Sequence, residues 1–540
     1  MDGSLFCANP FQVSMDRSAL LDQLLATDTY DIAIIGGGAT GLGVALDATL
    51  RGYKVVLLEA HDFAKGTSSR ATKLVHGGVR YLAQGNLSLV KEALHERGVL
   101  LHNAPHIAQP LAFVMPSYKW WETAFYGIGL MIYDLLAGKS AIGSTEFLSK
   151  EQVLERLPEV QSKGLRGGVQ YWDGQFDDAR LAIEIARTAH SKGAHLLNYC
   201  KVESILHQHE KVAGLTCQDR ESKRLLNIKA NCVINATGVW VDGIRSKDAE
   251  ISGEKIEPLL TPSQGVHLVV DRSFLSQDCA LLVPSTQDGR VLFAVPWLGK
   301  VILGTTDTPR TDLPIEPLPF KQEVDFILKE SARYLTKAPT PQDVRSVWVG
   351  LRPLVKPHNT VSGSTKGISR EHTILMSKSG LVTVTGGKWT TYRAMAEDVI
   401  QQCLEAGLVK SFDKDVTTAD CPLVGAIDFS SDSETLSLTH AQGLHSYGAE
   451  KSLLMTMPGA DTWLCEGLSE AMVRFAVRFE YARTVEDVLA RRSRLLFLDA
   501  QLALELSDKV ATILESEKIH NPQLAAFKTL AQSYMLPTTH

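Results

Sequence analysis

Apolar residues near the start of the chain form two short runs, separated by a glycine turn and a stretch compatible with a helix. The first run begins at Tyr30 and the second ends at Glu59. β-branched apolar runs bounded by turn residues predict buried strands, whereas residues 39–50 have the spacing and length of a helix. The segment 30–60 therefore predicts a strand, a turn, a helix and a second strand.

The turn inside this unit carries Gly36, Gly38 and Gly41 in the order GxGxxG. Glycine permits a tight turn and lets backbone N–H groups approach a pyrophosphate, which then faces a helix N-terminus. Glu59 is placed to accept hydrogen bonds from ribose hydroxyls, and its charge argues against NADP. Glycines also form such turns for packing alone, but the flanking strands, the helix length and Glu59 together favour a dinucleotide site.

Two later segments repeat the pattern of an apolar strand that ends in small residues. Residues 231–240 read NCVINATGVW, and residues 380–393 read GLVTVTGGKWTTYR. The first unit alone does not distinguish FAD from NAD, because both cofactors share the adenosine-pyrophosphate half. Each later segment taken singly is equally compatible with a plain turn between sheet and helix. Together and in this order, they indicate a flavoprotein.

The stretch 117–138 concentrates aromatic and aliphatic side chains between Lys119 and Lys139. It is shorter than the roughly 20 apolar residues that a membrane span needs, so we expect no transmembrane helix. Aromatic residues flanked by lysines suit the boundary between water and lipid, which favours peripheral membrane contact. A buried core helix and a dimer contact are the alternatives.

From about residue 415 the apolar spacing becomes helical. It predicts helices over Glu470–Tyr481 and Val485–Leu498, with Thr484 and Asp487 as a capping box. Six arginines give this region a basic character, at positions 474, 478, 483, 491, 492 and 494. We interpret them as a solvated face balanced by acidic neighbours, with a partner or lipid-headgroup surface as the alternative.

Composition narrows the class of protein. The chain has 540 residues, 44% of them hydrophobic and 21% charged, which is typical of a folded protein of two or more domains. A net charge of -6 makes nucleic acid an unlikely partner. The eight cysteines are scattered without a CxxC pair, so we expect no metal site and a reducing compartment. The acidic residues 1–30 resemble neither a secretory signal nor a transit peptide, which favours a cytoplasmic protein.

Several further motifs are dense and specific. They are GTSSRATKLVHGGVRYL (66–82), NAPHIAQPL (103–111), YWDGQFDDARL (171–181), VPWLGKVILGTTDT (295–308), GLRPLV (350–355) and SREH (369–372). With the dinucleotide turn and TGGKWTTYR, the chain resembles the FAD-dependent glycerol-3-phosphate dehydrogenase family, within the glycine-oxidase-like flavoproteins. The lack of a transit peptide and of a DxDxDG calcium loop indicates the bacterial type.

The resemblance implies an α/β fold, with the chain divided into three successive regions. A Rossmann-like, discontinuous FAD-binding domain and an interleaved β-rich substrate domain (roughly 105–165 and 250–350) share residues 30–400. An N-terminal extension covers residues 1–29, and an all-α C-terminal domain covers residues 401–540. The resemblance further implies a homodimer at the cytoplasmic face of the inner membrane.

The implied reaction is the oxidation of sn-glycerol 3-phosphate to dihydroxyacetone phosphate by hydride transfer to FAD, with a membrane quinone as the electron acceptor. A glycerol-3-phosphate oxidase that uses dioxygen and a non-catalytic flavin-binding protein are the alternatives. His267 is the first candidate for the base that takes the hydroxyl proton, with Arg352 as its rival or partner. The residues implied to bind substrate are Tyr81, Thr305, Arg352, Arg370 and Lys388.

FAD is expected to be held without a covalent bond. Besides Gly36, Gly38, Gly41 and Glu59, the resemblance and the turn chemistry assign it Ala39, Thr40, Ser68, Ser69, Thr72, Lys73, His76, Gly77, Gly78, Ala236, Thr237, Gly238, Gly387, Lys388, Trp389 and Thr390. Ser69 and Thr72 are equally compatible with helix caps, and His267 with a hydrogen-bonded core histidine.

Overall fold

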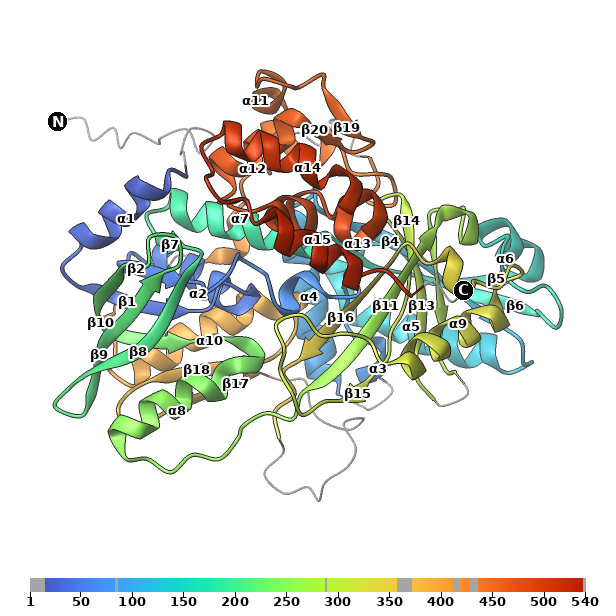
Figure 1. Ribbon diagram of the computed structural model, residues 1–540. Helices are drawn as coiled ribbons and strands as arrows, with labels where there is room; N and C mark the ends of the chain where they lie inside the picture. Colours follow the sequence, from blue (N-terminus) through green and yellow to red (C-terminus); the bar gives the residue numbers. More distant parts are fainter. Residues whose placement is uncertain are drawn as a thin grey trace, which may run out of the picture.

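The computed structural model describes residues 15–82, 86–286, 289–356, 372–411, 417–426 and 436–537. It contains two large β-sheets side by side, and C-terminal helices lie along the top of both (Figure 1). Among the described residues, none of the helices combines the length and apolar character that crossing a bilayer requires.

The eight-stranded first sheet contains the predicted dinucleotide unit. This unit consists of β1 (Tyr30–Ile35), α2 (Ala39–Leu50) and β2 (Val55–Leu58), as the apolar pattern predicts. The parallel order is β18-β10-β1-β2-β7. The strands before the two later glycine turns are β10, which pairs with β1, and β18, which pairs with β10. The other bounds are β7 His195–Leu197, β8 Cys200–Gln208, β9 Lys211–Asp219, β10 Leu225–Asn235, β17 His372–Met376 and β18 Val382–Gly386.

Three segments from the start, middle and end of residues 30–393 therefore meet at one edge. Because the carboxyl ends of parallel strands point the same way, the turns after β1, β10 and β18 lie together there. Ala236 N–H donates to the Ile35 carbonyl (2.9 Å), and the Thr385 hydroxyl donates to the Gly238 carbonyl (3.2 Å). This convergence is the one that the sequence pattern predicts.

The ten-stranded second sheet is almost entirely antiparallel and runs β15-β11-β14-β13-β12-β4-β6-β3, with β16 beside β11 and β5 beside β6. Its bounds are β3 Leu74–Val75, β4 Ala108–Ser117, β5 Glu146–Ser149, β6 Gly167–Phe176, β11 Ser263–Asp271, β12 Cys279–Val283, β13 Leu292–Trp297, β14 Lys300–Gly304, β15 Thr308–Pro309 and β16 Ser346–Arg352. A two-stranded ribbon, β19 (Trp463–Cys465) and β20 (Leu468–Ser469), lies among the C-terminal helices.

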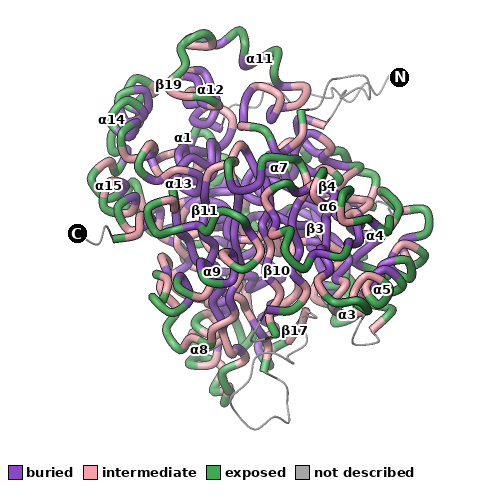
Figure 2. Tube along the Cα trace, turned by 90° about the vertical axis from the view of Figure 1, so that its right-hand side faces the viewer, coloured by how far each residue is buried: buried purple, intermediate pink, exposed green. Residues whose placement is uncertain are grey.

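Helices surround these sheets. Outside the C-terminal region they are α1 Arg17–Ala26, α3 Val79–Leu82, α4 Leu87–Asn103, α5 Glu122–Ala137, α6 Lys150–Arg156, α7 Asp178–Ser191, α8 Val241–Ser252, α9 Lys321–Tyr334 and α10 Tyr392–Glu405. The tube coloured by burial shows a buried interior, with α5 at the periphery (Figure 2). On α5, Phe125, Ile128 and Leu135 are 65%, 59% and 80% exposed, so this helix is not the fully buried core helix that was one of the alternatives.

The C-terminal helices are α11 Lys451–Met455, α12 Glu470–Phe479, α13 Leu495–Leu498, α14 Ala500–Ser516 and α15 Leu524–Ser533. They share one apolar core with the second sheet, which includes Trp297 and Trp348. The capping box is confirmed, because Thr484 N–H and Asp487 N–H each donate to the other residue's side chain (3.0 and 3.1 Å).

The expectation of one helix over Val485–Leu498 is wrong. A π-helical segment, η10 (Asp487–Arg492), is followed by α13, and Arg494 between them adopts a left-handed conformation with φ of 59°. The expectation of a solvated arginine face is also wrong for Arg491, Arg492 and Arg494. Their exposed fractions are at most 2%, because buried carboxylates and carbonyls of the preceding domain bind them.

Candidate functional site

A cavity of about 1620 Å³ lies where the three glycine turns meet the second sheet. Most of the residues assigned to a dinucleotide line it: Gly36, Gly38, Ala39, Thr40, Glu59, Ser68, Thr72, His76, Gly78, Ala236, Thr237, Gly238, Gly387, Lys388, Trp389 and Thr390. Gly41, Ser69, Lys73 and Gly77 lie behind this lining.

The dinucleotide turn has no room for side chains. A Cβ added at Gly36, whose φ is 109°, would lie 2.6 Å from the Ala236 carbonyl oxygen. A Cβ at Gly41 would lie 2.0 Å from the Gly36 carbonyl oxygen. These approaches require glycine at both positions, since side-chain carbons do not come under about 3 Å of backbone atoms.

The Glu59 carboxylate is already engaged by the backbone. Gly37 N–H donates to Oε2 (2.7 Å) and His61 N–H donates to Oε1 (2.8 Å). Burial raises the pKa of this carboxyl, although both N–H groups oppose the rise. Each carboxylate oxygen has a second lone pair, so ribose hydroxyls can still bind from the cavity side.

The loop 66–73 forms the middle of the cavity wall and contacts the neighbouring segments. Ala39 N–H at the start of α2 donates to Ser68 Oγ (2.9 Å), and the Trp389 indole donates to the Ser68 carbonyl (2.8 Å). The Thr67 hydroxyl donates to the Leu351 carbonyl (2.6 Å), next to Arg352. The loop therefore links the dinucleotide turn to the part of the cavity that lies beside Arg352.

Arg352, Thr305, Asp307 and Lys388 all line the cavity, and the part beside Arg352 is its cationic end. Arg352 Nη1 donates to Asp307 Oδ1 (3.1 Å), and Nη2 donates to Thr305 Oγ1 (3.3 Å) and the Thr306 carbonyl (2.9 Å). These contacts hold the guanidinium plane at the cavity edge, where its positive charge attracts an anion.

Two of the residues assigned to substrate lie beyond what the structure describes. Arg370 falls in the segment 357–371, outside the described residues, and the side chain of Tyr81 is likewise outside them. Their assignments stay predictions.

His267 on β11 is fully buried and lies one residue behind the cavity wall. Its Nε2 is 3.0 Å from the hydroxyl of Thr72, which lines the cavity, and its ring stacks on Trp348 with centroids 4.1 Å apart. Burial, then the charges of Lys73 and Arg352, hold the pKa of His267 well below its usual range. The imidazole is therefore neutral near pH 7.

The apolar end of the cavity was not predicted from the sequence. Strands of the second sheet supply Phe113, Met115, Tyr171, Leu282 and Phe293, and α5 supplies Phe125, Tyr126, Ile128, Leu130 and Ile132. The motif YWDGQF contains Tyr171, but a buried strand gives no sign of which face borders a cavity. The structure shows that the side chains from these strands and those from α5 line the same cavity.

Comparisons with known proteins extend over nearly the whole chain. Residues 31–393 match the model of a family described as FAD dependent oxidoreductase, and residues 416–523 match the C-terminal domain of alpha-glycerophosphate oxidase. The mitochondrial glycerol-3-phosphate dehydrogenase of Rattus norvegicus is 40% identical over 537 residues, which cover 93% of this chain and 72% of that protein.

Solved structures agree in fold. The glycerol-3-phosphate dehydrogenase of Bacillus halodurans, complexed with FAD, has a TM-score of 0.75 and 28% identity, covering 97% of this chain and 98% of its own. The glycine oxidase of Geobacillus kaustophilus has a TM-score of 0.50 and 20% identity, covering 72% of this chain and 97% of its own, and supports the fold alone.

Proposed function

Because the chain belongs to the FAD-dependent glycerol-3-phosphate dehydrogenase family, we propose that it oxidises sn-glycerol 3-phosphate to dihydroxyacetone phosphate and delivers the electrons to a membrane quinone. The observation that carries this proposal is the cavity, which joins a dinucleotide turn, a cationic end and an apolar end in one space. The dinucleotide turn suits FAD, the cationic end suits the substrate phosphate, and the apolar end suits the quinone.

The residues fit FAD. The approaches at Gly36 and Gly41 open a side-chain-free cradle at the N-terminus of α2, where a pyrophosphate is stabilised. Glu59 faces the ribose position, and the turns at Thr237 and Gly387 border the same space. FAD supplies a two-electron acceptor for the hydride that leaves the alcohol carbon. We expect it to be releasable, since the family resembles the non-covalent type.

Arg352 and Lys388 bind the substrate phosphate in this proposal, with Arg370 as a further cation and Thr305 and Tyr81 contacting substrate hydroxyls. The support is that Arg352, Lys388 and Thr305 all line the cavity, and that Arg352 contacts Thr305. Cations are required there because a phosphate dianion loses its hydration on entering.

His267 serves as the base through Thr72. Burial and the charges of Lys73 and Arg352 lower the pKa of His267, so the neutral imidazole is a weaker base than an exposed histidine. The Thr72 hydroxyl lies between Nε2 and the cavity (3.0 Å), which provides a path for the proton. The substrate hydroxyl proton therefore moves to Thr72 Oγ1 as the Thr72 proton moves to Nε2. Arg352 stabilises the developing negative charge on the substrate oxygen.

The acceptor arrives at the apolar end. Phe125, Ile128 and Ile132 of α5 both line that end and are exposed at the surface, so one helix borders the cavity and the outside. A quinone is an apolar molecule dissolved in lipid, and an exposed aromatic and aliphatic face suits the interface of a membrane. We accordingly place α5 against the cytoplasmic face of the inner membrane.

The second sheet is proposed as the core of the substrate domain expected over roughly 105–165 and 250–350, because its strands border the cationic and apolar ends. The family resemblance alone supports a homodimer. Sedimentation velocity of the purified protein tests the dimer directly.

The deciding experiment is an anaerobic titration of the yellow holoenzyme with sn-glycerol 3-phosphate, followed by a quinone analogue or air. Bleaching of the flavin absorbance that quinone reverses quickly, and air slowly, supports the dehydrogenase. Fast reversal by air with peroxide release indicates the oxidase instead. A flavin that substrate does not bleach rejects the assigned reaction and favours the non-catalytic binding protein.

A further inference from the structure

Three arginines of the C-terminal domain are buried against the rear of the FAD site. Arg491, Arg492 and Arg494 are at most 2% exposed, and each guanidinium stays charged in a protein. Buried charges are costly unless they are paired, so the groups that these arginines bind show which segments the C-terminal domain holds.

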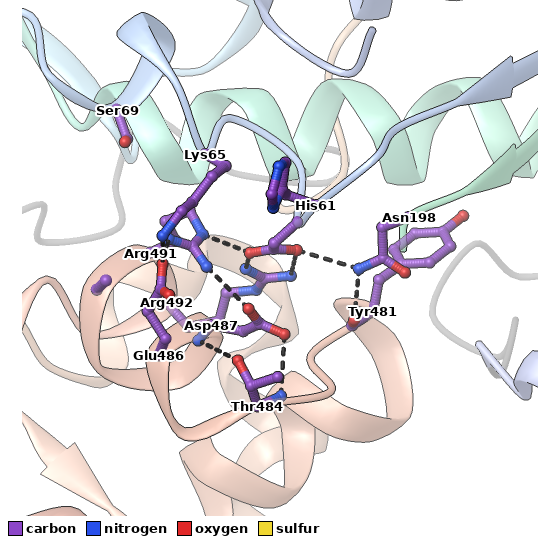
Figure 3. Close-up of polar contacts among 12 residues, drawn as sticks. His61, Lys65, Ser69, Asn198, Tyr481, Thr484, Glu486, Asp487, Arg491 and Arg492 are labelled. Atoms are coloured by element: carbon purple, nitrogen blue, oxygen red, sulfur yellow. Dashed lines mark hydrogen bonds and ion pairs between the residues drawn. The ribbon is translucent and has the colours of Figure 1, made fainter. Parts of the chain in front are cut away.

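Arg491 and Arg492 bind the segment that follows β2. Arg491 Nε donates to Asp62 Oδ2 (2.5 Å), and Arg492 Nη2 donates to Asp62 Oδ1 (3.0 Å), while Asn198 also donates to Oδ1 (3.1 Å). Burial opposes ionisation of Asp62, but the two arginines hold its pKa below the usual range. Asp62 follows His61, which lines the cavity and appears beside this network in Figure 3.

A second contact reaches the loop 66–73. Arg494 Nη2 donates to the Ser69 carbonyl (2.8 Å) and to Asp178 Oδ1 (3.1 Å). Asp178 Oδ2 in turn accepts from Ala71 N–H (3.0 Å) and from Lys73 Nζ (2.7 Å). Lys73 Nζ also donates to the Ser69 carbonyl (2.8 Å). Arg494, Lys73 and Asp178 thus hold the backbone of the loop on the side away from the cavity.

The loop is only one residue layer thick. Ser68, Ala71 and Thr72 line the cavity, whereas Ser69 and Lys73 face the C-terminal domain. A displacement at the Ser69 carbonyl would therefore move Ser68 and Thr72, whose hydroxyls bind the dinucleotide turn and His267.

The backbone at Arg494 gives a second, independent observation. Its φ of 59° lies in the left-handed region, which is strained for a residue other than glycine. Glycine would relieve that strain, but it would remove the guanidinium. The hydrogen bonds of the Arg494 guanidinium offset this strain. The strained backbone is therefore kept together with a side chain that binds Ser69 and Asp178.

We infer that Arg494, acting through Asp178 and Lys73, is a positioning residue that holds the loop 66–73 in its FAD-binding shape. The C-terminal domain then contributes to FAD affinity without touching the cofactor. The inference depends on FAD binding alone and holds whichever substrate or acceptor the enzyme uses.

The test compares Arg494→Met and Arg494→Lys with Arg187→Met in the full chain. Arg187 on α7 is also buried and pairs bidentately with Glu450 (2.6 Å for both bonds), but it contacts nothing in the loop 66–73. Removing either arginine leaves a buried carboxylate without one cation, so both changes lower stability. The two sites differ in their contact with the loop.

FAD is titrated into each apo protein, and the dissociation constant is read from quenching of flavin fluorescence. Arg494→Met is expected to raise it at least about tenfold, the loss typical of one charged hydrogen bond. Arg494→Lys should give a smaller rise, because an ammonium keeps the charge without the fork. Arg187→Met should change it less than twofold, although its melting temperature falls. An equal effect of Arg494→Met and Arg187→Met on FAD affinity would overturn the inference.

Asp178→Asn provides a second route if Arg494→Met does not fold. It keeps the shape of the side chain and removes the charge that holds Lys73 and Arg494. We expect weaker FAD binding and an altered visible circular dichroism of the bound flavin. Unchanged affinity and spectrum in this variant would also overturn the inference.

Discussion

The guanidinium of Arg352 combines charge with a fixed plane at the cationic end of the cavity. Arg352→Lys keeps the charge but loses the two-armed contact to Asp307 and Thr305. We expect kcat/KM for sn-glycerol 3-phosphate to fall about 100-fold, because the lysine ammonium lacks the contacts that fix the positive charge at this point of the cavity. FAD content should not change.

Arg345→Lys is the matched control in steady-state assays. Arg345 directly precedes β16, is 46% exposed and pairs with Asp271 at the surface. Its kcat/KM should stay within twofold of the unmodified enzyme. If Arg352→Lys behaves the same way, Arg352 does not bind substrate.

His61 makes stability depend on pH. Burial, then the charges of Arg220 and Lys65, lower the pKa of His61 to about 4 from an ordinary value of 6.5. Between these values the unfolded chain binds a proton that the folded protein does not bind. The free energy of unfolding therefore falls as the pH drops from 6.5 toward 4, and it is restored above 6.5.

Urea unfolding of the apo protein at pH 7 and pH 5 checks this linkage. His61→Gln should lose about 2 kcal/mol less stability over that interval than the unmodified chain, since each pKa unit is worth about 1.4 kcal/mol. His209→Gln, on an exposed turn between β8 and β9, should follow the unmodified chain. The same loss in all three proteins would contradict the assignment to His61.

Helix α5 presents its apolar residues outward. Trp120, just before the helix, is 82% exposed, and Trp121 packs edge-on against Phe125. Trp120→Ser combined with Trp121→Ser should weaken sedimentation with anionic liposomes at least about tenfold, because the apolar area transferred to lipid falls.

The exposed Trp463 on β19 lies in the C-terminal ribbon and provides the control for the liposome assay. Trp463→Ser should leave binding unchanged. Equal liposome binding by the double variant and the unmodified protein would remove α5 from the membrane interface.

Local patterns predicted the elements whose hydrogen bonds and apolar faces are set within a few residues. The unit β1–α2–β2 and the capping box of Thr484 and Asp487 are of this kind. The break at Arg494 was not predictable, because it depends on Ser69, which lies 425 positions away in the sequence. Apolar spacing does not record such a partner.

In the site too, features set by local sequence were predicted, whereas features that depend on distant segments were not. The three glycine turns were predicted to converge, and the parallel strands bring them together. Ser69 and Lys73 were assigned to the cofactor with their neighbours, yet they face away from the cavity. In an irregular loop no periodicity tells which side chains point forward. The apolar end was missed because it requires strands and α5 from separate parts of the chain.

At the level of the whole molecule, the C-terminal domain and the FAD site are coupled through the segment 59–73. The segment 59–73 contacts the cavity on one side and Arg491, Arg492 and Arg494 on the other. Binding energy on one side must then stabilise the other, because coupling between two sites is reciprocal.

Removing FAD should therefore loosen both sides of this segment. We expect faster amide hydrogen exchange in residues 36–41 and 59–73, and also in residues 487–494, which FAD does not touch. At a free FAD concentration of 100 times the dissociation constant, the linkage is worth about 2.7 kcal/mol, so protection should fall by up to about 100-fold. Helix α9, which packs on the second sheet in a separate apolar cluster, should not change and serves as the internal control. If the loss of protection stops at residue 73, FAD is not coupled to the C-terminal arginines.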